Sequence, residues 1–317
     1  MQTQAQEQDM RHSRNQSHFS AALLAGAIAL AIGVGLPHRA EAADFRGVSV
    51  EVVGDGTPVL MIPGLNSGMD TWRDTCSALQ PQVQCHLVQL PGFAGQPAVE
   101  EEAYLEGMRD RLLGYVDSAN LEQPVVVGHS LGGVVAMQMA IARPEAVGKL
   151  VVVDALPYLG AAQNPAATAE QVNRTAGQMR AAMEAADDAS YMAQLIGMLP
   201  TQTRTVERLG TLEEWARASD RAVTTQALYE VMTTDLRAEV GRIEAPTLVL
   251  ASWAGYAPLG ATPETVRGGF EAQYAALDGV QIEMSADGYH FLMWDDPQWL
   301  RQHVREFVGA APDTAAR

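Results

Sequence analysis

Five residues in the middle of the chain, Gly128-His129-Ser130-Leu131-Gly132, restrict the possible folds more than any other feature. The apolar run 124–127 precedes them and the small-residue stretch 133–142 follows, so a buried strand, a tight turn and a helix start succeed one another. A Cβ atom at position 128 or 132 would clash in such a turn, which explains the flanking glycines. The pattern therefore predicts a turn that lifts the Ser130 hydroxyl out of a sheet as a nucleophile, with an accidental glycine–serine turn as the alternative.

Short apolar runs alternate with helical patterns along the rest of the chain, which is typical of a mainly parallel sheet covered by helices on both faces. The expected strands are 48–53, 58–62, 84–90, 124–127, 150–153, 247–250 and 280–284. The expected helices include 69–79, 100–118, 132–143 and 297–308. The sequence therefore predicts an α/β fold with a doubly wound, mainly parallel sheet.

A long segment, residues 156–243, interrupts this alternation after the expected strand 150–153. It is rich in Ala, Gln, Met and Glu and predicts helices that are broken near Pro200 and Gly210. Its methionines could form an adaptable apolar lining or simply fill the contacts between helices, and the second interpretation is favoured for Met179, Met183, Met192, Met198 and Met232. We expect these helices to form a segment separate from a core of residues 43–155 and 244–308, with a disordered tail at 309–317.

Other motifs resemble the α/β-hydrolase family. The run 58–62 followed by Pro63-Gly64-Leu65-Asn66 is similar to that family's third strand and oxyanion loop, and Trp72 is similar to a tryptophan in the helix that follows. His290 lies where the family brings a histidine back over the nucleophile. The resemblance extends over about residues 45–308 and implies an esterase- or lipase-like serine hydrolase with a cap inserted after the sixth strand.

This resemblance assigns most of the catalytic roles. A serine hydroxyl is a poor nucleophile without a neighbouring base, and the resemblance implies His290 as the base for Ser130. The oxyanion of the intermediate needs fixed hydrogen-bond donors. The backbone N–H of Leu131 is one expected donor, and that of Leu65 is the second, with Asn66 as the alternative.

The acid that orients His290 is harder to place. The family most often carries it just after the seventh strand, but residues 252–263 contain no carboxylate. Some relatives carry it at the end of the sixth strand, where Asp154 follows the apolar run 150–153. Because a buried carboxylate without a partner is costly, we expect Asp154 to orient His290. Glu264, or a triad without an acid, is the alternative.

Serine suits attack on acyl carbon, whereas attack on alkyl carbon within this family uses an aspartate nucleophile. We therefore expect a carboxylesterase that cleaves small to medium acyl esters. Lactonases, thioesterases, amidases and perhydrolases share the same apparatus. A catalytically degenerate binding protein on the same fold is the alternative from another class.

Charge and histidine spacing bear on partners and cofactors. The formal net charge of −17 over 317 residues disfavours a nucleic-acid partner. The expected partner is a small-molecule ester substrate, as the serine nucleophile implies. No histidine of the mature chain has metal-ligand spacing, so neither a metal nor another cofactor is expected. His129 is expected to pack with its side chain directed away from Ser130, and Asp235 is expected to form a cap or an ion pair.

The first 42 residues are typical of a secretory signal peptide. Arg11 and Arg14 precede the apolar run 21–36, and Ala40-Glu41-Ala42 resembles a cleavage site. A run of about 16 residues is shorter than the roughly 20 that span a bilayer, so no stable membrane insertion is expected after cleavage. A periplasmic or secreted protein is therefore expected. In such an oxidising compartment Cys76 and Cys85 are expected to form a disulfide, with two buried thiols as the alternative.

Overall fold

The computed structural model describes residues 42–162 and 164–309, which all belong to one compact unit of the chain. Residues 1–41 of the expected signal peptide and residues 310–317 of the expected tail lie outside the described residues. Helix α10 (Pro297–Gly309) extends one residue beyond the predicted helix 297–308. No helix within the described ranges has the length and apolar character needed to cross a membrane.

An eight-stranded sheet runs through the described residues in the order β1-β2-β4-β3-β5-β6-β7-β8. The pairs β1–β2 and β2–β4 are antiparallel, and every other pair is parallel. The predicted doubly wound, mainly parallel sheet is therefore confirmed. Its strands are β1 Ala43–Phe45, which was not predicted, β2 Val48–Val53, β3 Thr57–Ile62, β4 Val83–Gln89, β5 Val125–His129, β6 Lys149–Val153, β7 Thr247–Ala251 and β8 Gln281–Met284.

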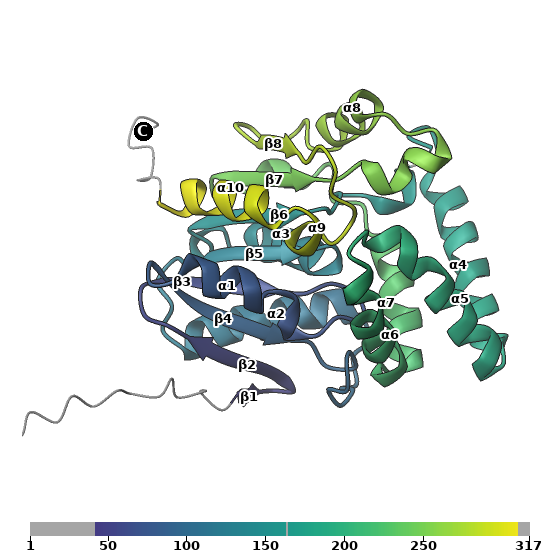
Figure 1. Cartoon of the computed structure of the whole chain (residues 1–317), viewed down its shortest axis with the longest axis horizontal. Helices are drawn as coiled ribbons and strands as arrows, with labels where there is room; N and C mark the ends of the chain where they lie inside the picture. Colours follow the sequence, from purple (N-terminus) through teal and green to yellow (C-terminus); the bar gives the residue numbers. More distant parts are fainter. Residues whose placement is uncertain (1–41, 163, 310–317) are drawn as a thin grey trace, which may run out of the picture. The chain divides into compact units, whose positions relative to one another are not determined.

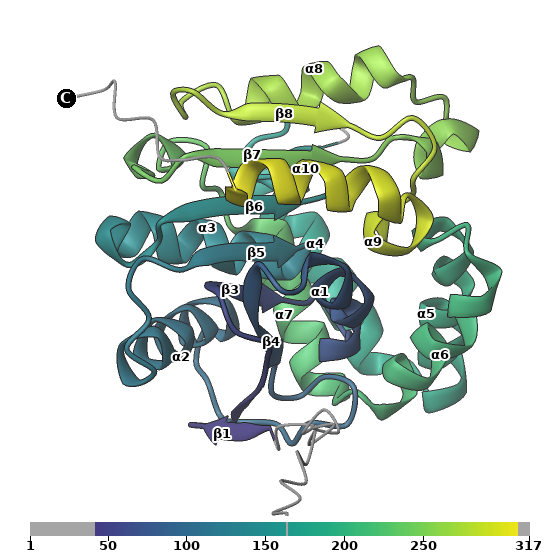
Figure 2. The ribbon, with the colours of Figure 1, turned by 60° about the vertical axis from the view of Figure 1, so that its left-hand side comes forward.

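Helices cover both faces of this sheet, as Figures 1 and 2 show. Successive strand residues point to opposite faces, so Val126 joins one apolar core while Val125 and Val127 join the other. The core that contains Val126 is completed by α2 (Tyr104–Ser118), α3 (Leu131–Ala142) and α8 (Pro263–Gln273). The opposite core is completed by α1 (Arg73–Leu79) and α10. Burial on both faces explains the nearly continuous apolar runs of the central strands.

Four further helices lie between β6 and β7, namely α4 Ala169–Ala185, α5 Asp188–Gln202, α6 Leu209–Ala218 and α7 Arg221–Thr233. Figure 1 shows them beyond the carboxyl ends of β5, β6 and β7. Helix α5 continues through Pro200, so the predicted break falls a few residues later, between Gln202 and Leu209. The methionines of this insertion do not share one environment, because Met183 is buried whereas Met198 is 61% exposed.

Two of the expected helices differ from the prediction by several residues at their N-terminal ends. The helix expected over residues 100–118 begins at Tyr104, because Glu230 of α7 accepts the N–H groups of Tyr104 and Leu105, both at 2.8 Å. This cap comes from a distant helix, so local sequence does not reveal it. The helix expected over residues 69–79 divides into a 3-10 turn, Met69–Thr71, and α1.

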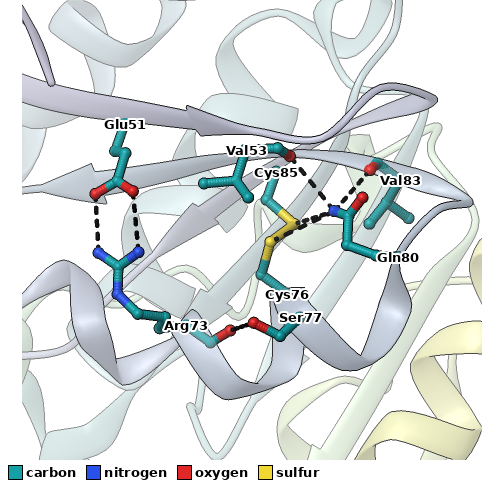
Figure 3. The surroundings of a disulfide bond; sticks show 8 residues. All are labelled: Glu51, Val53, Arg73, Cys76, Ser77, Gln80, Val83 and Cys85. Atoms are coloured by element: carbon teal, nitrogen blue, oxygen red, sulfur yellow. Dashed lines mark hydrogen bonds and ion pairs between the residues drawn. A yellow bond between two sulfur atoms is a disulfide. The ribbon is translucent and has the colours of Figure 1, made fainter. Parts of the chain in front are cut away.

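Helix α1 is fastened to the sheet by a disulfide and an ion pair, as Figure 3 shows. Cys76 of α1 is bonded to Cys85 of β4, so the predicted pairing is confirmed. Arg73 of α1 donates two hydrogen bonds, of 2.9 and 2.8 Å, to the carboxylate of Glu51 in β2. Gln80, just beyond α1, donates to the carbonyl of Val83 at 2.9 Å. These contacts hold α1 in place against the sheet. Helix α1 follows the loop after β3, and this loop forms one side of the candidate site.

Candidate active site

Ser130 occupies a strained turn between β5 and α3. Its φ of 53° and ψ of −120° lie outside the regions that residues with a Cβ atom ordinarily adopt. Its N–H donates to the carbonyl of Val153 in β6 at 3.0 Å, and its own carbonyl accepts from Gly133 N–H at 2.8 Å. Strain of this kind persists only where the surroundings hold it on both sides, and it is concentrated at functional sites.

The two glycines that flank this turn are required by close approach of the backbone. A Cβ atom on Gly128 would lie 2.2 Å from the carbonyl oxygen of Gly132. A Cβ atom on Gly132 would lie 2.5 Å from the carbonyl oxygens of Ile62 and Pro63. The steric reason predicted for both glycines is thus confirmed, and the loop after β3 packs directly against the turn that carries Ser130.

Asp154 and His290 meet in the structure. Asp154 directly follows β6 and is 8% exposed, and its Oδ2 atom lies 2.6 Å from Nδ1 of His290. The same carboxylate accepts hydrogen bonds from Ser252, from N–H to Oδ1 at 2.7 Å and from Oγ to Oδ2 at 2.8 Å. Glu264, the alternative partner, is exposed in the first turn of α8. Asp154 therefore has the contact with His290 that an orienting acid needs.

His129 connects the Ser130 turn to the loop of His290. Its Nε2 atom lies 3.0 Å from the carbonyl oxygen of His290, and the two imidazole rings are 4.5 Å apart. A carbonyl oxygen only accepts, so Nε2 carries the proton of His129. Burial, with a contribution from His290, holds the pKa of His129 well below its usual value. His129 is buried as packing residues are, but the prediction missed this polar contact, which nothing in the local sequence indicated.

The residues expected to supply the oxyanion donors lie next to Ser130, one in the chain and one in the adjacent loop. Leu131 is the first residue of α3, so its N–H has no acceptor within that helix and lies at the positive end of the helix dipole. A Cβ atom on Gly64 would lie 3.2 Å from Cβ of Ser130, which places the loop that contains Leu65 beside Ser130. Asn66 in this loop has a φ of 54° and accepts a hydrogen bond of 2.6 Å from Thr224 of α7. Helix α7 therefore helps to hold the loop in place.

The insertion also contacts the loop of His290 directly. The N–H of Phe291 donates to the carbonyl of Gln202, at the end of α5, at 3.0 Å. The carboxylate of Asp295 accepts from the hydroxyls of Thr203 and Thr205 at 2.6 and 2.7 Å, and from the N–H of Tyr289 at 3.1 Å. One aspartate thus joins the segment after α5 to the residue that precedes His290. Asp235, in contrast, pairs with Arg237 at 2.7 Å, as predicted for an ion-pair residue.

A doubly wound, mainly parallel sheet with a strained serine turn, in which an aspartate just after β6 meets a histidine from the loop after β8, is the architecture of an α/β hydrolase. A model of the "Alpha/beta hydrolase family" matches residues 59–303. The chain therefore belongs to the alpha/beta hydrolase family.

The chain is similar to several individual proteins. The biotin biosynthesis bifunctional protein BioHC of Cellvibrio japonicus is 29% identical over 264 residues, which are 79% of this chain and 47% of that protein. A pimeloyl-[acyl-carrier protein] methyl ester esterase of Aeromonas hydrophila is 33% identical over 111 residues, 35% of this chain and 42% of that protein. The chain thus spans about half the length of these curated relatives. An esterase structure from Exiguobacterium antarcticum has a TM-score of 0.68 at 16% identity, covering 83% of this chain and 96% of its own, and this likeness concerns the fold.

Proposed function

We propose that this protein is a serine hydrolase that cleaves carboxylic esters of small to medium acyl groups through an acyl-enzyme. Ser130 is the proposed nucleophile, His290 the general base and acid, and Asp154 the residue that orients and stabilises His290. The backbone N–H groups of Leu131 and Leu65 are the proposed oxyanion donors.

The observation that carries this proposal is the 2.6 Å contact between Asp154 Oδ2 and His290 Nδ1. Because the carboxylate accepts the Nδ1 proton, Nε2 of His290 is left unprotonated in the neutral ring and can accept the proton of a serine hydroxyl. The contact between His129 and the His290 backbone also supports a Ser130–His290 pair, because His129 immediately precedes Ser130 and so ties the loop of His290 to the turn that carries the serine.

The first half of the proposed reaction acylates the enzyme. Ser130 Oγ attacks the ester carbonyl while His290 Nε2 takes the hydroxyl proton, and the carbonyl oxygen becomes an oxyanion that the N–H groups of Leu131 and Leu65 stabilise. Collapse of this intermediate breaks the bond to the alkoxy oxygen, and His290 returns its proton to the departing alcohol. The Asp154 carboxylate stabilises the imidazolium ion between these two proton transfers.

The second half repeats the steps with water. His290 removes a proton from a water molecule as that molecule attacks the acyl carbon, and then returns the proton to Ser130 Oγ when the carboxylic acid leaves. The net reaction consumes one ester and one water and yields one acid and one alcohol. No group other than these side chains and backbone donors is needed.

The esterase name of the Aeromonas hydrophila relative supports ester cleavage. The proposal of a degenerate binding protein rested on the missing carboxylate after β7. The contact between His290 and Asp154, at the end of the neighbouring strand β6, supplies a carboxylate and so removes this argument for a binding protein.

We also propose that the protein is exported, because the signal-peptide pattern of residues 1–42 and the Cys76–Cys85 disulfide both suit an oxidising compartment. N-terminal sequencing of the protein recovered from a periplasmic or culture fraction tests this proposal. Retention of residues 1–42 in a cytoplasmic fraction would contradict it.

The test of the catalytic proposal compares the wild-type enzyme with Ser130→Ala. The wild type should be labelled by a fluorophosphonate probe and should hydrolyse members of a panel of p-nitrophenyl esters, lactones and amides. Ser130→Ala should lose both properties and keep its circular dichroism spectrum, because only the nucleophilic oxygen is removed. Turnover by the variant close to that of wild type would refute the serine mechanism.

A further inference from the structure

We infer that Ser252 is a positioning residue for the proposed reaction, holding the Asp154 carboxylate in the orientation in which it meets His290. This inference rests on the proposed function. Ser252 directly follows β7, and Asp154 directly follows β6. The two strands are parallel neighbours, with Val153 opposite Leu250, so the residues just beyond their carboxyl ends lie side by side.

Ser252 donates hydrogen bonds to both oxygens of the Asp154 carboxylate. Its N–H donates to Oδ1 at 2.7 Å and its hydroxyl donates to Oδ2 at 2.8 Å. With the His290 contact at Oδ2, these two bonds give the carboxylate three hydrogen-bond partners, two of them from Ser252, which restrict its rotation. The backbone of Asp154 is held as well, because its N–H donates to the carbonyl of Leu250 at 2.8 Å.

The hydroxyl bond has a direct consequence for His290. Oδ2 accepts both the Ser252 hydroxyl at 2.8 Å and His290 Nδ1 at 2.6 Å, so the hydroxyl determines how this oxygen is presented to the imidazole. Ser252 is 1% exposed and Asp154 is 8% exposed. Bulk water therefore has little access to replace the hydroxyl if it is removed, and an under-satisfied buried carboxylate is costly.

The kinetic test uses Ser252→Ala, which removes the hydroxyl and keeps the N–H, with Ser252→Thr as the matched control that keeps both donors. Loss of one hydrogen bond to a charged group should lower kcat by about 10- to 100-fold in Ser252→Ala. KM should change little, because Ser252 acts on the base and not on the substrate. Ser252→Thr should keep most of the wild-type kcat.

A proton NMR measurement reads the same geometry without a substrate. The proton between His290 Nδ1 and Asp154 should give a far-downfield resonance in the wild type that is lost in Asp154→Asn. In Ser252→Ala this resonance should shift or broaden. A Ser252→Ala protein with wild-type kcat and an unchanged resonance would overturn the inference. If the wild type hydrolysed no substrate of the panel, the proposed function would fail, and the resonance would still decide whether Ser252 positions Asp154.

Discussion

Replacing Asp154 with asparagine tests the site most sharply, because both carboxylate oxygens of Asp154 face hydrogen-bond donors. Oδ1 accepts from Ser252 N–H at 2.7 Å, and Oδ2 accepts from Ser252 Oγ at 2.8 Å and His290 Nδ1 at 2.6 Å. An amide of the same shape has one oxygen and one NH2 group, so the NH2 group must face a donor in either orientation. The orientation that keeps the bond to the Ser252 N–H turns the NH2 group toward His290.

In that orientation His290 accepts a hydrogen bond at Nδ1 and carries its proton on Nε2, which is the wrong tautomer for removing a proton from Ser130. The negative charge that would stabilise the imidazolium is lost as well. Together these effects should lower kcat by about 10²- to 10⁴-fold, or roughly 3–5 kcal/mol of transition-state stabilisation. KM should change little, since Asp154 does not contact the proposed substrate.

The assay measures kcat, KM and melting temperature for Asp154→Asn and Glu264→Gln side by side on the best ester of the panel. Glu264→Gln is the matched control, because Glu264 is exposed at the start of α8 and should tolerate the change with wild-type kcat. If Asp154→Asn kept near-wild-type kcat while Glu264→Gln was crippled, the assignment of Asp154 as the orienting acid would be refuted.

The disulfide predicts that the mature protein, denatured without reductant, contains no titratable thiol, and that reduction releases two, from Cys76 and Cys85; two thiols before reduction would contradict it. Burial lowers the pKa of His86 from 6.5 to about 4, so the unfolded chain binds more protons between these values. The contribution of the buried, neutral His86 ring to the free energy of unfolding should be complete above pH 6.5 and should fall as the pH drops toward 4. Urea unfolding at pH 7 and pH 5 should therefore show that the free energy of unfolding falls less for His86→Asn than for wild type. Equal decreases in the two proteins would show that His86 does not cause the pH dependence.

The sequence was sufficient for those features of the site that local pattern determines. Ser130 was recognisable because a strand, flanking glycines and a helix start are contiguous in the chain. Asp154 was recognisable because a carboxylate closes an apolar run and must find a partner. Its contact with His290 spans 136 positions, and residue type and chain order predicted it without any knowledge of distance.

The supporting residues were not predictable in the same way. Ser252 and Asp295 are common residue types in irregular segments, and their roles arise from contacts between distant parts of the chain. Strand register could have indicated Ser252, because residues that follow neighbouring parallel strands meet at one edge of the sheet. No comparable rule indicates Asp295, whose partners Thr203 and Thr205 lie in the connection between α5 and α6.

The position of His290 depends on both the sheet and the insertion between β6 and β7. Asp154 at the end of β6 holds the imidazole, and His129 at the end of β5 holds the backbone carbonyl. The adjacent residue, Phe291, is bonded to the end of α5. Since Asn66 in the proposed oxyanion loop is bonded to α7, the insertion touches the surroundings of both the base and the oxyanion donors. In the proposed reaction, a displacement of α5 or α7 should therefore disturb the placement of His290 and of the oxyanion loop, and so should lower kcat as well as change KM.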